Sequence, residues 1–231
     1  MRIINVIFAL FFVTNYSIAQ VTDREGNTYQ TVVIGKQTWM AENLNVSHFR
    51  NGDTIPEVKS NKEWLEAAQH QKPAWCYYKN KTKHGEKYGK LYNWFAVSDS
   101  RGLAPEGWHV ATFEEWHKLD TLYGAQKQEF YNNGYDSLGF QLKSSTGWKK
   151  GNGSNSSGFT GLPGGLRKTK GIMGGFLVYT GVSFRSIRKW ACWWYISPYH
   201  HGDFELSFIT NDLYTFSCYK GHGLSVRCVK D

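Results

Sequence analysis

The sequence predicts a single α+β domain, with short helices in the N-terminal half and an irregular antiparallel sheet in the C-terminal half. Of the 231 residues, 41% are hydrophobic and 16% aromatic, enough apolar area to offset the entropy lost on folding. The 24 glycines follow no fixed period and accompany only 5 prolines, which indicates many tight turns. Helical periodicity is confined to the first half, and no internal repeat or long linker divides the chain.

The first part of the chain has the pattern of a hairpin. Two strand-like runs, 28–34 and 37–41, flank a Gly35-Lys36 turn. Residues 23–27 form a second turn, because Asp, Gly and Asn favour turn conformations.

Three helices are expected before residue 125. Residues 60–69 begin with Ser60 and Glu63 at capping-box spacing. Apolar residues cluster in 91–97, which predicts a short second helix. The third covers 113–123, where the Thr112 N-cap precedes an apolar stripe and Gly124 follows as the helix end.

The second half is made of short β-prone runs. A polar Gly/Ser/Asn loop covers 147–158, and Gly, Asn or Asp separates the runs that follow it. Such spacing favours a compact antiparallel sheet. The runs are GFTGLPGGLR, GGFLVYTGVSF, WACWWYISPY, FELSFI, YTFSCY and GLSVRCV.

Residues 1–19 are typical of a signal peptide, which leaves 20–231 as the functional domain. Arg2 precedes an apolar run, and Ser17-Ile18-Ala19 fits a cleavage site before Gln20. The run is shorter than the roughly 20 residues of a spanning helix, so no integral membrane segment is expected. No cysteine follows the cleavage site, which argues against a lipid anchor. The predicted location is periplasmic, cell-surface or extracellular.

The formal net charge of +8 is compatible with nucleic acid or acidic polysaccharide as a partner. Lys and Arg are scattered, the densest clusters (79–90 and 167–170) are short, and no nucleic-acid motif accompanies them. We therefore expect no nucleic-acid partner. A solvated basic surface and affinity for acidic glycans both fit this charge.

No residue set predicts catalysis, a bound metal or a cofactor. There is no G-x-S-x-G elbow and no CxxC pair. In a strand, His201, Asp203 and Glu205 share one face and offer ligand atoms, but a polar turn between aromatic strands has the same composition. Residues 152–157 offer oxygen ligands for calcium, but we interpret them as a solvated loop.

An aromatic cluster is the best candidate for ligand binding. In a strand Trp193 and Trp194 point to opposite faces, so one joins the core and the other is available to stack on a sugar ring. Packing of the whole cluster in the core is the alternative. The candidate binding residues are Trp190, Trp193, Trp194, Tyr199 and His201.

Six segments in order resemble the Fibrobacter succinogenes major paralogous domain, which is common in secreted proteins of Bacteroidetes and Fibrobacteres. The resemblance spans nearly the whole chain, although Ala111 replaces the family's usual proline. The segments are TDREGNTYQTVVIGKQTWMAENLNV (22–46), AWCYY (74–78), YGKLYNWFAV (88–97), LAPEGWHVATFEEWHKL (103–119), GFTGLPGGLR (158–167) and GLSVRCVKD (223–231).

The resemblance implies a C-type-lectin-like fold, because the GWHVAT..EW segment is also similar to C-type-lectin-like and formylglycine-generating-enzyme-like domains. The N-terminal hairpin and the GLSVRCV strand are then neighbours. The EPN, QPD and WND tripeptides of calcium-dependent lectins are absent, and the cysteine pair of formylglycine-generating enzymes has no clear counterpart. The resemblance implies no established activity.

The four cysteines are candidates for disulfides in an exported protein. Spacing alone allows three pairings, and reduced buried thiols remain an alternative. The family resemblance implies the Cys76–Cys228 pair, which leaves Cys192–Cys218 as the second.

The sequence therefore predicts a secreted, non-catalytic binding module for a glycan or another cell-surface ligand. A structural or adhesion protein that binds an envelope protein is the alternative, and an enzyme of unknown reaction is the third hypothesis.

Overall fold

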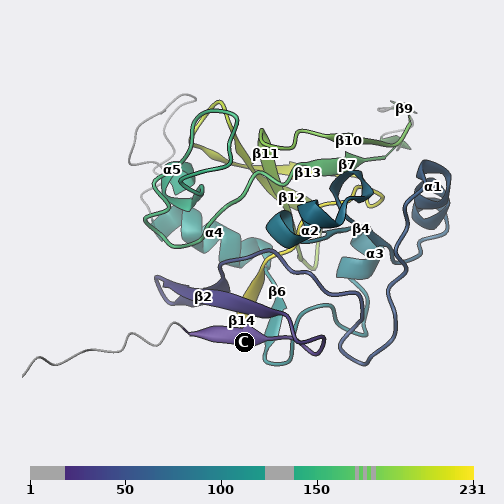
Figure 1. Cartoon of the computed structure of the whole chain (residues 1–231), viewed down its shortest axis with the longest axis horizontal. Coiled ribbons are helices and arrows are strands. Elements are labelled where there is room, and N and C mark those ends of the chain that lie inside the picture. Colours follow the sequence, from purple (N-terminus) through teal and green to yellow (C-terminus); the bar gives the residue numbers. More distant parts are fainter. Residues whose placement is uncertain (1–18, 123–137, 170–171, 174–175, 178–180) are drawn as a thin grey trace, which may run out of the picture.

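The computed structural model describes residues 19–122, 138–169, 172–173, 176–177 and 181–231. The predicted signal peptide, apart from its last residue, lies outside the described residues, as does Gly124. Among the helices described, none has the length and apolar character needed to cross a bilayer. The observed class is mixed helix and antiparallel sheet, as predicted (Figure 1).

The largest sheet has five strands in the order β1-β2-β3-β14-β6. It joins the predicted N-terminal hairpin to the last strand, so the main sheet is not confined to the C-terminal half. Val229 of β14 pairs with Trp39 of β3 on one side and with His109 of β6 on the other, which confirms the expected contact between hairpin and final strand. The strands are β1 (Gln20–Thr22), β2 (Thr28–Ile34), β3 (Gln37–Met40), β6 (Trp108–Val110) and β14 (Cys228–Lys230).

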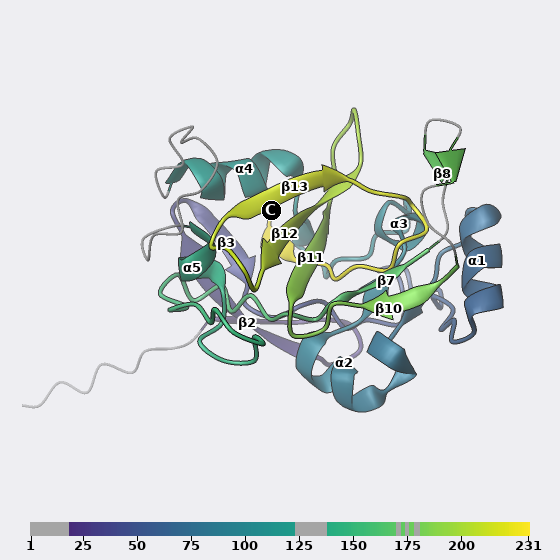
Figure 2. The same ribbon diagram turned by 90° about the horizontal axis from the view of Figure 1, so that it is seen from above.

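A second sheet has the order β11-β12-β13, and its three strands lie side by side in Figure 2. Three two-stranded pairs, β4-β5, β7-β10 and β8-β9, complete the sheets of the described residues. Their bounds are β4 (Trp75–Cys76), β5 (Leu91–Tyr92), β7 (Leu166–Lys168), β8 (Ile172–Met173), β9 (Phe176–Leu177), β10 (Ser183–Arg185), β11 (Trp190–Tyr195), β12 (Gly202–Ser207) and β13 (Leu213–Ser217).

Two of the predicted helices form with the predicted caps. In α1 (Asn61–Gln69), Ser60 Oγ accepts from the Glu63 amide at 3.1 Å and donates to the Glu63 carboxylate at 2.7 Å. In α4 (Phe113–Leu122), Thr112 Oγ1 accepts from the Glu115 amide at 3.2 Å, and the Glu115 carboxylate accepts from the Thr112 amide at 2.8 Å. These reciprocal bonds satisfy amides that a helix start leaves without partners.

The predicted helix at 91–97 is shorter than expected. Leu91 and Tyr92 are strand β5, and α3 covers only Trp94–Val97, capped by the Asn93 side chain. The sequence analysis also missed η1 (Tyr78–Asn80), α2 (Thr82–Tyr88) and α5 (Leu138–Leu142). Helix α2 has no side-chain cap and contains Gly85, which lowers helix propensity. That glycine is needed because a Cβ there would lie 2.0 Å from the Tyr77 ring.

The core is divided by strand β11, which buries both of its faces. Cys192 and Trp194 pack into the cluster that includes Tyr92 and Cys228. Trp193 packs on the other face into a cluster with Trp39, Trp116 and Phe159. Although β11 is at the edge of its sheet, core clusters cover both of its faces, so it lacks the simple alternation of polar and apolar residues.

Arg227 lies at the centre of the second cluster with no exposed surface. Its Nε donates to Asn43 Oδ1 at 2.7 Å, its Nη1 to the carbonyls of Met40 at 2.8 Å and Phe159 at 2.7 Å, and its Nη2 to the carbonyl of Thr160 at 3.0 Å. Burial lowers the pKa of this guanidinium to about 9. The guanidinium thus joins the end of β3 to the 158–160 loop and to β14.

Replacing Arg227 by Met is expected to lower the free energy of unfolding by more than about 3 kcal/mol, because several buried acceptors lose their donor together. Arg227→Lys keeps the charge but reaches fewer acceptors, so its loss is intermediate. Urea denaturation measures both. The matched control Arg185→Met, at an exposed position on β10, should change stability by less than about 0.5 kcal/mol. Equal losses in Arg227→Met and Arg185→Met would contradict this role.

His109 connects β6 to α4 and to the C-terminal residue. Its Nε2 lies 2.8 Å from Glu115 Oε1, and its Nδ1 lies 2.6 Å from Asp231 Oδ1. Partial burial lowers the pKa of His109, but the hydrogen bonds to Asp231 and Glu115 outweigh it, so the net shift is upward. A raised histidine pKa means that the folded state binds the proton more tightly than the unfolded state.

The stabilisation from His109 is therefore fully present below the unfolded pKa of about 6.5 and is lost as the pH rises through the raised value. The free energy of unfolding should fall over this range, and His109→Gln should remove that part of the slope. Urea denaturation in steps above pH 6 tests it. Burial lowers the pKa of His222 to about 4, so its contribution is lost in a separate window, as pH falls from about 6.5 toward 4. Identical slopes above pH 6.5 in the unmodified protein and in His109→Gln would contradict this role of His109.

Candidate functional site

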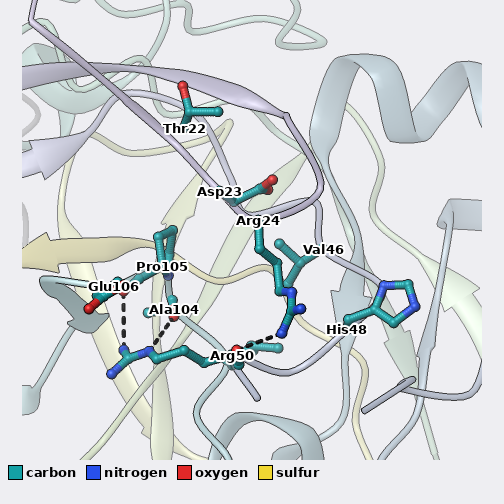
Figure 3. Close-up of a pocket in the computed structure, with 10 residues that line it drawn as sticks. Thr22, Asp23, Arg24, Val46, His48, Arg50, Ala104, Pro105 and Glu106 are labelled. Atoms are coloured by element: carbon teal, nitrogen blue, oxygen red, sulfur yellow. Dashed lines mark hydrogen bonds between the residues drawn. The ribbon is translucent and has the colours of Figure 1, made fainter. Parts of the chain in front are cut away.

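A surface pocket of about 250 Å³ lies between the turn after β1, the 46–50 segment and the loop before β6 (Figure 3). Its wall includes two apolar side chains, Val46 and Leu103, which are almost fully buried. Its polar lining includes two arginines and a histidine. The lining residues are Thr22, Asp23, Arg24, Val46, His48, Arg50, Leu103, Ala104, Pro105 and Glu106.

Asp23 builds the turn that forms one wall. Its Oδ1 accepts from the amides of Glu25 at 2.8 Å and Asn27 at 3.0 Å. Its Oδ2 accepts from Asn27 Nδ2 at 2.8 Å and from the Tyr29 hydroxyl at 2.7 Å. Burial, followed by the neighbouring Asp23 carboxylate, raises the pKa of Tyr29. Asp23 therefore holds the turn in place, and its oxygens are already engaged.

Arg24 leaves this turn and crosses to the opposite wall. Its Nη1 donates to the Arg50 carbonyl at 2.7 Å, a bond that Figure 3 shows as a dashed line. The guanidinium packs on Gly52, where a Cβ would lie 2.9 Å from Nη1 and where φ is +103°. Glycine is thus required at that position both for the backbone conformation and for the approach of Arg24.

Arg50 is fixed by the loop before β6. Its Nε donates to the Ala104 carbonyl at 3.1 Å, and its Nη2 donates to the carbonyls of Pro105 at 3.1 Å and Trp108 at 2.7 Å. Within the described residues, Nη1 of Arg50 and both Nε and Nη2 of Arg24 make no hydrogen bond. These donors are held by rigid neighbours and are available to a ligand.

His48 lies on the other side of Arg24 from the Arg50 guanidinium (Figure 3). The His48 amide donates to Glu25 Oε1 at 2.7 Å, and His48 Nδ1 lies 3.0 Å from the same oxygen. That contact fixes the ring and leaves Nε2 for the pocket. The exposed carboxylate of Glu106 lies on the Arg50 side of the pocket.

The sequence matches the model of the Fibrobacter succinogenes major domain over residues 32–230. The chain belongs to this family. No curated protein and no solved structure gives a significant match to the chain. Residues 22–24 of the pocket precede the matched segment, whereas the walls contributed by 46–50 and 103–106 lie within it.

In this Fibrobacter succinogenes major domain the two central tryptophans of the predicted binding cluster are both core residues. Trp193 and Trp194 have no exposed surface. The indole of Trp193 donates to Asn43 Oδ1, and that of Trp194 donates to the Tyr92 carbonyl, each at 2.8 Å. The expectation that one of them faces solvent is wrong, because clusters of the core cover both faces of β11.

The other three predicted residues are dispersed. Trp190 is partly buried against the core. His201 is partly buried, with its ring 5.3 Å from that of Trp94. Tyr199 is 91% exposed. The Arg24 pocket includes none of these residues.

The four cysteines of this Fibrobacter succinogenes major domain are free thiols, contrary to both predicted disulfides. Cys76 packs near Trp64 and Tyr78, whereas Cys228 packs in a different cluster around Tyr92. Burial raises the pKa of Cys76 to about 12 and also raises that of Cys228. Both are inert buried thiols by these criteria.

Sequence reasoning missed the pocket because its arginines are 26 positions apart and lie in turns. The predicted turn at 23–27 is correct, but nothing local to it indicates that Arg24 reaches Arg50. The feature that could have indicated the pocket is the occurrence of Arg24 and Arg50 in turns of a chain with an excess of basic residues.

Replacing Trp193 by Ala should lower the free energy of unfolding by about 3–5 kcal/mol, because a fully buried indole and its hydrogen bond are lost. Tyr199→Ala should change it by no more than about 0.5 kcal/mol. Thermal and urea denaturation measure both. A Trp193→Ala protein as stable as the Tyr199→Ala protein would contradict the core position of Trp193.

Proposed function

We propose that this protein is an exported, non-catalytic module that binds an acidic glycan in the pocket around Arg24. The observation that carries the proposal is a set of rigidly held, unpaired guanidinium donors beside an apolar wall. Guanidinium groups bind carboxylates and sulfates through charge-assisted hydrogen bonds. The apolar wall of Val46 and Leu103 suits the carbon face of a sugar ring.

The size of the pocket supports recognition of one sugar unit of a polymer. Its volume of about 250 Å³ is below the roughly 300–1,000 Å³ of pockets that enclose drug-sized ligands. A polymer with an acidic group on each unit still gains affinity because many units compete for the same pocket.

The lining residues support binding rather than catalysis. Hydrolysis of a glycosidic bond needs two carboxyl groups on either side of the bond. Asp23 has both oxygens engaged within its own turn, and Glu106 is the other carboxylate of the lining. The Thr22 hydroxyl faces the hydroxyl of Thr28 at 3.3 Å, so its hydrogen-bond partner is a second hydroxyl and not a base.

The proposal also includes export of the protein and a C-type-lectin-like fold. The leader-like residues 1–19 and the family's occurrence in secreted proteins support a periplasmic, cell-surface or extracellular location. The pairing of the N-terminal hairpin with β14 supports a C-type-lectin-like arrangement. Loops held by a rigid scaffold often carry binding residues, and the Arg24 pocket lies between loops.

The test compares binding of polygalacturonate and of a neutral galactan by thermal shift and calorimetry. The proposal predicts a rise in melting temperature with polygalacturonate that weakens with added salt. Arg24→Gln should reduce affinity by about tenfold, the loss of one charge-assisted bond, and Glu106→Gln should increase it. Arg185→Gln removes the same charge at a distant exposed position and should leave binding unchanged. Equal losses of affinity in Arg24→Gln and Arg185→Gln would show that net charge alone, and not the pocket, accounts for the binding.

A protein partner is the second candidate, and the edge of β13 favours it. In the described structure β13 pairs only with β12, and Phe216 on its surface is 49% exposed. Open strand edges accept a further strand from another chain. If neither polysaccharide changes the melting temperature of the folded protein, the edge of β13 becomes the proposed binding site and its ligand a protein.

A further inference from the structure

Three ligand-type side chains meet between strands β11 and β12. Cys192 pairs in register with Glu205, and Asp203 lies two residues away on the same face of the sheet. The Cys192 sulfur and one oxygen from each carboxylate lie within 4.8 Å of one another. The sequence analysis placed Asp203 and Glu205 on one face with His201, but the third member of the cluster is Cys192.

This cluster is buried and incomplete. Cys192 and Asp203 are 1% and 2% exposed. Oδ1 of Asp203 is buried and accepts no hydrogen bond from any described residue. Burial, followed by the neighbouring Glu205 carboxylate, raises the pKa of Asp203 well above its usual range. An unpaired carboxylate oxygen beside a second carboxylate is unfavourable unless a cation or a proton compensates it.

A second thiol lies beside the cluster. Cys218 follows β13, and burial, followed by the neighbouring Asp203 carboxylate, raises the pKa of its thiol. Cys218 and Glu205 are partly exposed, which gives an ion a route from solvent. A second sulfur from the segment after β13 thus lies beside the three clustered groups of β11 and β12.

We propose that Cys192, Asp203 and Glu205, with Cys218 as the fourth ligand, bind a thiophilic divalent cation of the Zn²⁺ class. Thiolate and carboxylate together suit Zn²⁺, whereas Ca²⁺ and Mg²⁺ select oxygen ligands alone. Zn–S and Zn–O distances of about 2.0–2.3 Å place neighbouring ligand atoms of a tetrahedral site roughly 3.5 Å apart. Side-chain adjustments on fixed strands therefore suffice to close the observed cluster.

Binding converts two thiols to thiolates and releases their protons to solvent. Any proton shared by the Asp203 and Glu205 carboxyls is released as well, and the ion binds the unpaired oxygen of Asp203. Its two positive charges offset half of the four negative charges on the two thiolates and two carboxylates. Affinity must consequently rise with pH, since protons compete for the same atoms. This site shares no residue with the Arg24 pocket and stands independently of the proposed glycan binding.

The test uses purified, reduced protein and Co²⁺ as a spectroscopic probe for Zn²⁺. We expect one equivalent of Co²⁺ to give a thiolate-to-metal charge-transfer band in the near ultraviolet, and Zn²⁺ to displace it. Cys192→Ser should remove the band, and Cys218→Ser should weaken it. The matched control Cys76→Ser changes a buried thiol in another core cluster and should retain the full band.

A stability measurement separates metal binding from a folding defect. Zn²⁺ should raise the melting temperature of the unmodified protein and of Cys76→Ser, but not that of Asp203→Asn. Asp203→Asn on its own removes a buried ionisable group and is expected to fold. Absence of a charge-transfer band in reduced protein overturns the site. A band or a Zn²⁺ shift that persists in both Cys192→Ser and Asp203→Asn also overturns it, as does a Cys192–Cys218 disulfide whose reduction yields no metal uptake.

Discussion

The buried guanidinium of Arg227 is the interaction on which the rest of this structure depends. A cation without exposed surface is tolerated here because its donors are matched by Asn43 and by three backbone carbonyls. Asn43 accepts in turn from Trp193 and donates to the Tyr88 carbonyl. One side chain just before the last strand thereby fixes the end of the N-terminal hairpin, an irregular loop and strand β11 at the edge of the second sheet. Much of this fold is irregular, and its irregular segments lack the regular backbone hydrogen bonds of helices and sheets. Their buried carbonyls therefore need a donor such as the Arg227 side chain.

Local rules were enough for part of the fold. The caps of α1 and α4 and the hairpin of β2 and β3 involve residues three to ten positions apart, so the sequence predicts them correctly. Trp193 and Trp194 show the limit of this reasoning, because alternation along a strand says which face a residue takes but not whether that face is covered. The cysteines show the same limit, since their partners are set by packing between distant segments. The Arg24 pocket and the Cys192 cluster arise only when such segments meet, and no motif of short period encodes them.

The two proposed sites differ in how their charges are held. In the Arg24 pocket, backbone carbonyls fix two guanidinium groups at the surface and leave some of their donors free. A ligand that binds there therefore loses little free energy to the ordering of side chains. In the Cys192 cluster the charges lie inside the sheet, where desolvation makes the unliganded state costly and an ion correspondingly favourable. The first arrangement suits a reversible, salt-sensitive contact and the second suits a tightly held ion.

The position of β14 inside the largest sheet has a consequence for how the protein folds. Its three residues follow β3 after most of the chain, yet they separate the hairpin from β6. The sheet cannot close before β14 is in place, and its decisive contacts join residues almost two hundred positions apart. Contacts of such long range make folding slow, because a long loop must close before they form.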